Sequence, residues 1–376
     1  MPGVYLSYPF CAQKCTYCNF ASGVFPSELE PRYVDALVAE IATHVWGWQP
    51  DTVYVGGGTP SGMATGDLDR ILRSLPDGRG SGKRVSASGD RWREATLEVA
   101  PGTVTGERAG AWASAGINRV SLGVQSFVQR ELARTGRKHT AEIVACDVTT
   151  LRAAGLSNIN IDLIAGLPGQ TRDSWQESLA WVERLQPPHV SVYMLEIDED
   201  SRLGNEVLLN GKRYGAPDVP GDELTAELYE TAVRELARIG IERYEISNFA
   251  RPGFESLHNL KYWRLEPYAG FGADAHSFDG AVRRQNIEAP DEYVSKIRSG
   301  GSACIGQTPA NPGEERFFVG LRLTQGVLLE PEEWSKFELP IERFLADGLL
   351  ARDHQRLRLT DRGVLFSNEV FAEFIN

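Results

Sequence analysis

Cysteine, methionine and histidine are scarce in this chain of 376 residues, which contains five, three and six of them. Five is an odd number and too few for a large secreted protein held by disulfides, so a reducing cytoplasm is favoured. No long apolar run is present, which excludes a membrane-spanning helix. The segment Met1–Tyr5 has no basic region followed by an apolar stretch, so we expect no secretory signal.

Basic residues are also in deficit, with 39 Lys and Arg against 51 Asp and Glu and a formal net charge of -12. An acidic chain is a poor ligand for a phosphate backbone, so we expect no nucleic-acid partner. The hydrophobic fraction of 42% is sufficient for buried cores, and the length predicts two or three domains.

Three of the five cysteines lie close together near the amino terminus, with the spacing C-x3-C-x2-C: Cys11, Cys15 and Cys18. Three thiolates can hold three irons of a 4Fe–4S cluster and leave the fourth iron open to a small molecule. A zinc-stabilised structural site is the alternative, but zinc normally takes four ligands and the nearest histidine is His44. Cys146 and Cys304 lie outside any ligand spacing, and we expect them to be inert thiols.

Short apolar strands alternate with amphipathic helices through the first two thirds of the chain. The expected strands are 51–55, 95–99, 119–125, 158–165 and 189–195, and the expected helices are 28–44, 107–115, one ending at 154, 174–185 and 223–239. This alternation predicts an α/β fold with a parallel sheet covered by helices. About six units fit between Val4 and Leu195, so we expect an open (β/α)6 partial barrel.

The domain organisation is predicted from the points at which the alternation of strands and helices changes. We expect a core at 1–249, a connecting segment at 250–312 and a small C-terminal winged-helix-like domain at 313–376, in which helices precede a strand pair around 349–359. The stretch 241–246 resembles a strand. Residues 77–93 are rich in Gly, Ser and Arg and predict a mobile excursion.

Polar residues follow several of the expected strands. Three glycines at 56–58 follow one strand and allow close backbone approach to a ligand. Glu98, Gln125 and Asp162 stand at later strand ends, and Arg137 lies on the loop after Gln125. In barrels of this kind functional residues gather at the carboxyl ends of the strands, although each residue alone also fits a cap or a loop hydrogen bond.

Six collinear motifs then narrow the interpretation: the three-cysteine spacing, Tyr-x-x-x-Pro-Phe-Cys from Tyr5, Gly-Gly-Gly-Thr-Pro at 56–60, Gly-Val-Gln-Ser-Phe at 123–127, Gly-Arg-x-His-Thr-Ala at 136–141 and Asp-Leu-Ile-x-Gly-Leu-Pro-Gly-Gln-Thr at 162–171. The chain therefore resembles the radical S-adenosylmethionine (SAM) family of oxygen-independent coproporphyrinogen III oxidase-like proteins. The resemblance implies a 4Fe–4S cluster on the three cysteines and a SAM site. Its residues would be Tyr5, Tyr17 beside the cluster, Gly57, Gly58, Thr59, Glu98, Gln125, Arg137, Asp162 and Glu196.

The residues around the cysteines separate the oxidase from the heme-chaperone (HemW-type) branch of this family. The oxidase has a further cysteine where this chain has Phe20, and it has a longer segment ahead of the cluster loop than the ten residues before Cys11. The family usually has a histidine where this chain has Ser7, and its loss argues against decarboxylation of coproporphyrinogen.

The chaperone branch carries a His-Asn-x-x-Tyr-Trp motif, which matches residues 258–263 here. By this resemblance heme would bind at His258, Asn259, Tyr262 and Trp263, with the imidazole as an iron ligand and the rings stacked on the porphyrin. The alternative interpretation is a capped, aromatic-rich linker. His276 is the rival iron ligand, in a stretch where the branch usually has Gly in place of Asp274.

Our leading hypothesis is a cytoplasmic heme chaperone that binds heme, SAM and a 4Fe–4S cluster and delivers heme to apo-cytochromes of the respiratory chain. The sequence leaves open whether it forms a homodimer and whether any radical catalysis occurs. A competing hypothesis is a radical SAM enzyme that decarboxylates the propionates of coproporphyrinogen III, or a related methylase. A zinc-stabilised structural protein is the third hypothesis.

Overall fold

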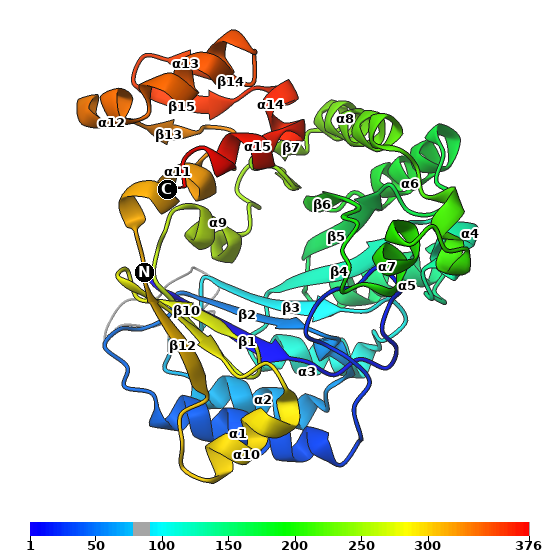
Figure 1. Ribbon diagram of the computed structural model, residues 1–376. Coiled ribbons are helices and arrows are strands. Elements are labelled where there is room, and N and C mark those ends of the chain that lie inside the picture. The colour runs from blue at the N-terminus through cyan, green and yellow to red at the C-terminus, as the bar shows by residue number, and fades with distance from the viewer. Residues whose placement is uncertain (78–90, 376) are drawn as a thin grey trace.

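The computed structural model describes residues 1–77 and 91–375, so most of the excursion expected at 77–93 lies outside the described residues. Six consecutive parallel strands form the centre of a twelve-stranded sheet. They are β1 (Gly3–Tyr8), β2 (Thr52–Gly57), β3 (Glu94–Val99), β4 (Arg119–Gln125), β5 (Asn158–Ala165) and β6 (His189–Met194). Figure 1 shows these strands in an arc with helices on its outer side, which confirms the predicted partial barrel.

The long helices between the strands cover the outer face of the sheet. They are α1 (Leu29–Thr43), α2 (Thr65–Ser74), α3 (Gly106–Ser114), α5 (Ala141–Ala153), α6 (Arg172–Leu185) and α8 (Asp222–Arg238). Helix α1 buries Tyr33, Leu37 and Ile41 together, because residues four apart lie on one helix face. Shorter elements η1 (Pro60–Gly62), α4 (Gln129–Arg134), α7 (Arg202–Leu208) and η2 (Arg213–Asp218) lie in the connections.

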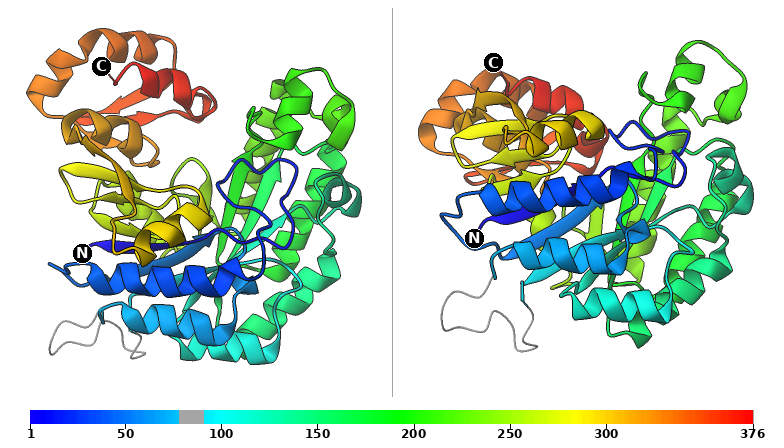
Figure 2. Two further views of the ribbon diagram at one scale, coloured as in Figure 1. Left: turned by 60° about the horizontal axis from the view of Figure 1, so that its bottom comes forward. Right: turned by 90° about the horizontal axis from the view of Figure 1, so that it is seen from below.

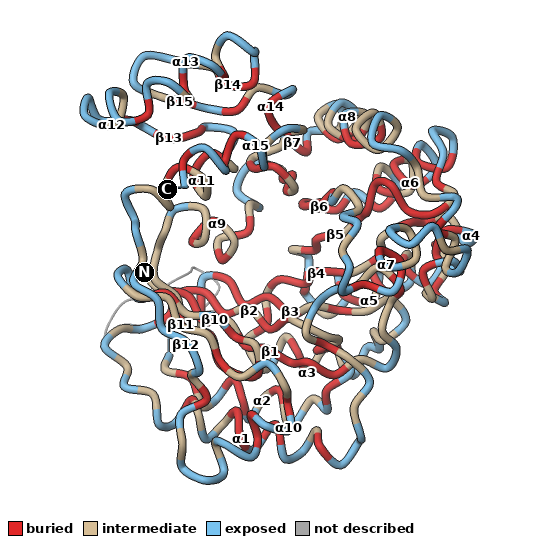
Figure 3. Tube along the Cα trace, viewed as in Figure 1, coloured by how far each residue is buried: buried red, intermediate tan, exposed pale blue. Residues whose placement is uncertain are grey.

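Side-chain alternation along each strand gives the barrel an apolar outer face and a polar inner face. In β4, Val120, Leu122 and Val124 are fully buried in the hydrophobic core, and the central strands are mostly buried in Figure 3. Because successive side chains point to opposite faces, Arg119 and Ser121 turn inward. The inner face is therefore where a polar ligand can be bound.

The segment expected as a connection extends the sheet instead of merely joining two domains. It contains β8 (Asn248–Ala250, which begins just before it), α9 (Leu257–Trp263), β9 (Tyr268–Phe271), β10 (His276–Phe278), β11 (Val282–Asn286), α10 (Pro290–Arg298) and β12 (Cys304–Pro309). Strand β9 pairs in parallel with β1. Of the expected strand at 241–246, only β7 (Glu242–Arg243) is present, and it pairs antiparallel with β8.

A small C-terminal unit follows, at the top of Figure 1. It contains α11 (Pro312–Gly320), β13 (Val327–Leu328), α12 (Pro331–Lys336), α13 (Glu338–Ala346), β14 (Leu350–Asp353), β15 (Arg356–Leu359), α14 (Asp361–Leu365) and α15 (Ser367–Ala372). The antiparallel pair of β14 and β15 was predicted, and β13 adds a third strand. Phe317, Phe337 and Phe374 pack together at its centre. Across the described ranges no helix is long and apolar enough to cross a membrane.

Candidate functional site

The cysteine loop begins where β1 ends, and the glycine turn after β2 holds the start of this loop by backbone hydrogen bonds. The amide of Gly58 donates to the Tyr8 carbonyl at 2.7 Å, and the amide of Thr59 donates to the Phe10 carbonyl at 2.8 Å. A Cβ atom on Gly58 would lie 2.6 Å from the Phe10 carbonyl oxygen. The predicted close approach therefore occurs between two protein backbones, and only glycine permits it at this position.

The far side of the loop is fixed by the segments after β4 and β6. The Nε of Arg137 donates to the Tyr17 hydroxyl at 3.1 Å, and the amide of Leu203 in α7 donates to the Thr16 carbonyl at 2.8 Å. The views in Figure 2 show the dark-blue loop beside the green segment that contains α7. The loop is thus anchored on both sides of the barrel mouth.

A cavity of about 430 Å³ opens between the cysteine loop and the carboxyl ends of β2 to β6. This volume is in the range usual for small-molecule sites. The cavity is lined by the three cysteines and by all but one of the predicted SAM residues: Tyr17, Gly57, Gly58, Thr59, Glu98, Gln125, Arg137, Asp162 and Glu196. The exception is Tyr5, whose ring stacks on Tyr54, with 6.0 Å between the ring centres.

Two carboxylates at the inner wall are held in place by hydrogen bonds. Glu98 accepts from the Tyr54 hydroxyl at 2.9 Å and from the Gly57 amide at 3.0 Å. Asp162 accepts from the Ser121 hydroxyl at 3.0 Å and from Asn160 Nδ2 at 2.7 Å. Burial raises the pKa of Glu98 to about 7, and burial also raises the pKa of Asp162. Both groups are oriented acceptors for hydroxyl or ammonium donors.

Gln125 and Arg137 complete the polar wall. Gln125 has a φ of 70°, and the pairing of β4 with β5 shifts register between Gly123 and Gln125. A non-glycine residue in the left-handed region is uncommon and concentrates at functional sites. Arg137 also donates from Nη1 to the Gly123 carbonyl at 2.7 Å, so its guanidinium is fixed between that strand and Tyr17.

The three thiols suit a cluster better than a single metal ion. Cys11, Cys15 and Cys18 are free thiols of intermediate exposure and all line the cavity. Three thiolates are one fewer than the four ligands that a structural zinc ion normally takes. A zinc site gathers its ligands around one ion, whereas an iron–sulfur cube places each thiolate on its own iron. The donor set therefore fits a 4Fe–4S cluster.

The predicted heme ligand His258 lies in α9, beside the first residues of β2 and β3, and its ring packs on Tyr54 of the cavity wall with 5.4 Å between the ring centres. Its Nδ1 hydrogen-bonds with Thr52 Oγ1 at 2.9 Å and its Nε2 with the Tyr262 hydroxyl at 2.8 Å. Burial, with the charges of Lys261 and Arg119, lowers the pKa of His258 to about 3. Both ring nitrogens are hydrogen-bonded in this conformation, so His258 could bind an iron only after one of these two bonds breaks.

The other predicted heme residues are spread around α9. Tyr262 packs edge-on against Tyr268 of β9, and the Trp263 ring lies under the guanidinium of Arg322 at 4.3 Å. Asn259 donates its amide to the capping hydroxyl of Ser256. The rival ligand His276 is exposed on β10. Asp274, nearby, has a φ of 56°, which explains a preference for glycine there.

Several residues of the site were missed in the sequence. Tyr54, Ser121 and Tyr193 line the cavity, and Asn160 supports it. Tyr54, Ser121 and Asn160 lie on the inner faces of strands whose ends carry predicted residues, so the period of two along each strand was the available signal. Buried Glu131 was also missed; it accepts from Ser126 and Gln170 and thereby joins two of the recognised motifs.

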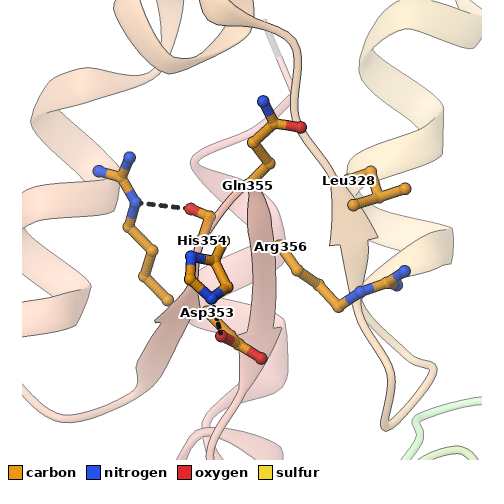
Figure 4. Close-up of a pocket in the computed structure, with 6 residues that line it drawn as sticks. Leu328, Asp353, His354, Gln355 and Arg356 are labelled. Atoms are coloured by element: carbon orange, nitrogen blue, oxygen red, sulfur yellow. Dashed lines mark hydrogen bonds and ion pairs between the residues drawn. The ribbon is translucent and has the colours of Figure 1, made fainter.

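A second hollow lies on the C-terminal unit, on the β14–β15 hairpin (Figure 4). Its lining is Leu328, Arg352, Asp353, His354, Gln355 and Arg356, none of which was predicted as a site residue. The Nε of Arg352 donates to the His354 carbonyl at 3.0 Å. We assign the function to the cavity at the cysteine loop, because that cavity carries the convergent polar residues.

Comparisons with known proteins agree with this assignment. The profile of the radical SAM superfamily matches residues 5–182, and that of the HemN C-terminal domain matches residues 307–366. The heme chaperone HemW of Lactococcus lactis is 33% identical, over 99% of this chain and 96% of its own length. HemW of Bacillus subtilis is also 33% identical, over 100% and 99%. The structure of coproporphyrinogen III oxidase (HemN) from Escherichia coli matches with a TM-score of 0.82 at 21% identity, over 99% of this chain and 90% of that one. That structural match shows the shared fold.

Proposed function

This chain belongs to the HemW heme-chaperone family of radical SAM proteins, and from this premise we propose that it binds heme, SAM and a 4Fe–4S cluster and transfers heme to apo-proteins of the respiratory chain. One observation carries the cofactor part. A single cavity brings together the three cysteines and nine of the ten predicted SAM residues. We also propose a cytoplasmic location, which five free thiols favour.

In this proposal Cys11, Cys15 and Cys18 hold the cluster, which when bound supplies an open iron and an electron. Glu98 and Asp162 accept hydrogen bonds from the hydroxyl and ammonium groups of SAM, since both carboxylates are already oriented by neighbouring donors. Arg137 binds the carboxylate of SAM, because a planar guanidinium matches a carboxylate well.

The heme part rests on the family and on the differences from the oxidase. Phe20 is 67% exposed where the oxidase has a further cysteine, and Ser7 is buried in β1 where a histidine is usual. We retain His258 as the proposed iron ligand. Its hydrogen bonds to Thr52 and Tyr262 must then break when heme binds. His276, exposed on β10, is the rival.

The proposal is tested by anaerobic reconstitution followed by addition of SAM, heme and coproporphyrinogen III in separate experiments. We expect about four irons per chain, a paramagnetic cluster signal that changes with SAM, and stable heme binding without formation of protoporphyrinogen. Zinc in place of iron would contradict the radical SAM assignment. Turnover of coproporphyrinogen III with a reductant would favour the enzyme over the chaperone. Loss of heme binding in His258→Ala but not in His276→Ala would identify the ligand.

A further inference from the structure

Arg119 is a buried guanidinium that the cofactor site does not use. It is the first residue of β4 and turns inward, like Ser121 two residues later. Its side chain is 2% exposed. Within the described ranges its Nε is buried without a hydrogen-bond partner. The nearest carboxylate oxygen, Oε2 of Glu94, lies 4.0 Å from Nε, which is beyond hydrogen-bond distance.

Glu94 forms an ion pair with Arg119 across 4.0 Å but no hydrogen bond, and Glu94 also holds the start of α9. Its carboxylate accepts from the amide of His258 at 2.8 Å and from the amide of Leu257 at 2.9 Å. The Nε–H of the buried Arg119 cation is left without an acceptor, which is costly, so a ligand carboxylate is the partner that would complete its hydrogen bonding.

The two side chains beside Arg119 also each have a buried polar atom without a hydrogen-bond partner. Thr96 of β3 and Asn158 of β5 are its register partners on either side. Thr96 Oγ1 and Asn158 Oδ1 are both buried without a hydrogen-bond partner. Glu98 and Asn160, the residues two further along these strands, belong to or support the cavity wall. Thr96, Arg119 and Asn158 therefore form a row of neighbouring side chains, each with a buried polar atom that has no partner. On β3 and β5 the row lies two residues before the residues of the cavity wall.

We propose that Arg119, assisted by the hydroxyl of Thr96, binds a carboxylate of the molecule carried in the barrel, namely a propionate of the porphyrin. This inference rests on the proposed function. A guanidinium fork pairs with a carboxylate through two hydrogen bonds, and the threonine hydroxyl adds a third donor. Glu94 contacts the start of α9 and lies beside Arg119. Displacement of α9 therefore uncovers the guanidinium at the same time as it frees His258 for iron.

The test compares a porphyrin acid with its ester, in wild type and variants. Protoporphyrin IX and its dimethyl ester are titrated against the full-length protein by fluorescence; neither contains iron, so a histidine ligand does not contribute. We expect wild type to bind the acid at least tenfold more tightly than the ester. Arg119→Gln should weaken binding of the acid tenfold or more and leave the ester unchanged, since a hydrogen bond to a charged group is worth about this factor. Arg119→Lys should recover part of the preference.

The matched control is Arg93→Gln, which removes an arginine that pairs with Asp51 at the same end of the barrel but is 49% exposed. It should keep the wild-type preference for the acid. Equal affinity of wild type for acid and ester, as expected if the row holds only water, would overturn the inference while the chaperone proposal stands. Absence of any porphyrin binding by wild type would overturn the proposed function itself.

The melting temperature of the ligand-free protein separates a binding role from a structural one. Arg119→Gln removes the cation that lies 4.0 Å from the buried carboxylate of Glu94, so we expect a small decrease in its melting temperature while binding of the ester is retained. A lower melting temperature together with equal loss of affinity for acid and ester would show that Arg119 serves the fold through Glu94, and would overturn the inference.

Discussion

Replacing Glu98 by Gln tests the electrostatics of the cavity, because burial raises the pKa of the Glu98 carboxyl to about 7. A pKa raised from 4.5 to about 7 corresponds to at most about 3 kcal/mol of folding free energy. Since the folded state favours the protonated acid, this stability is fully present below about pH 4.5 and is lost as the pH rises through 7. Partial exposure to solvent reduces the value, and we expect about 1–3 kcal/mol.

The assay is thermal unfolding of ligand-free protein at pH 5 and pH 8 at constant ionic strength. Gln has one acceptor oxygen and loses one of the bonds from Tyr54 and Gly57, which offsets its stability, but Gln does not titrate and so has no pH dependence of its own. The stability of Glu98→Gln relative to wild type should therefore rise between pH 5 and pH 8. Glu177→Gln, which removes a charge from the exposed face of α6, is the control. A relative stability that is flat or falls with pH would refute the reasoning.

Three further changes probe the loop, the SAM site and the sheet extension. Gly58→Ala places a Cβ 2.6 Å from the Phe10 carbonyl oxygen and should lower the iron content after reconstitution, whereas Gly62→Ala, with nothing within 4 Å, should not. Arg137→Lys should weaken SAM binding about tenfold in calorimetry, because Lys loses the planar fork; unchanged affinity would argue against the assigned role. Glu40→Gln should destabilise the protein by about 1–3 kcal/mol in denaturant unfolding. The reason is that one amide oxygen replaces a carboxylate that accepts from three donors of the 272–293 segment. An unchanged free energy of unfolding would show that these three hydrogen bonds do not stabilise the fold.

The central strands could be predicted from sequence because their apolar runs are local and end at polar or glycine residues. The predicted bounds of β4 and β5 agree with the structure. Strands β9 to β12 were missed because they are short and because β12 is largely exposed, so no alternating apolar pattern marks them. Strand β9 exists through its pairing with β1, more than 260 residues earlier in the chain, and local propensity does not report such a partner.

The residues of the site likewise fall into those that could be predicted from the sequence and those that could not. Glu98, Gln125 and Asp162 were predictable because parallel strands bring their carboxyl ends to one edge. The state of His258 was not predictable, since its Nδ1 partner Thr52 lies 206 residues away in sequence. The unsatisfied row at Arg119 was likewise hidden, because it depends on the registers of three strands at once.

Transfer of heme is the most direct test of the chaperone assignment. The reconstituted protein is loaded with heme, separated from free heme, and mixed with an apo-cytochrome of the respiratory chain. The Soret band is then followed in each protein after separation. We predict that heme leaves this protein and appears in the cytochrome faster than from a heme–albumin control. Heme that stays bound, or that transfers no faster than from albumin, would contradict the assignment.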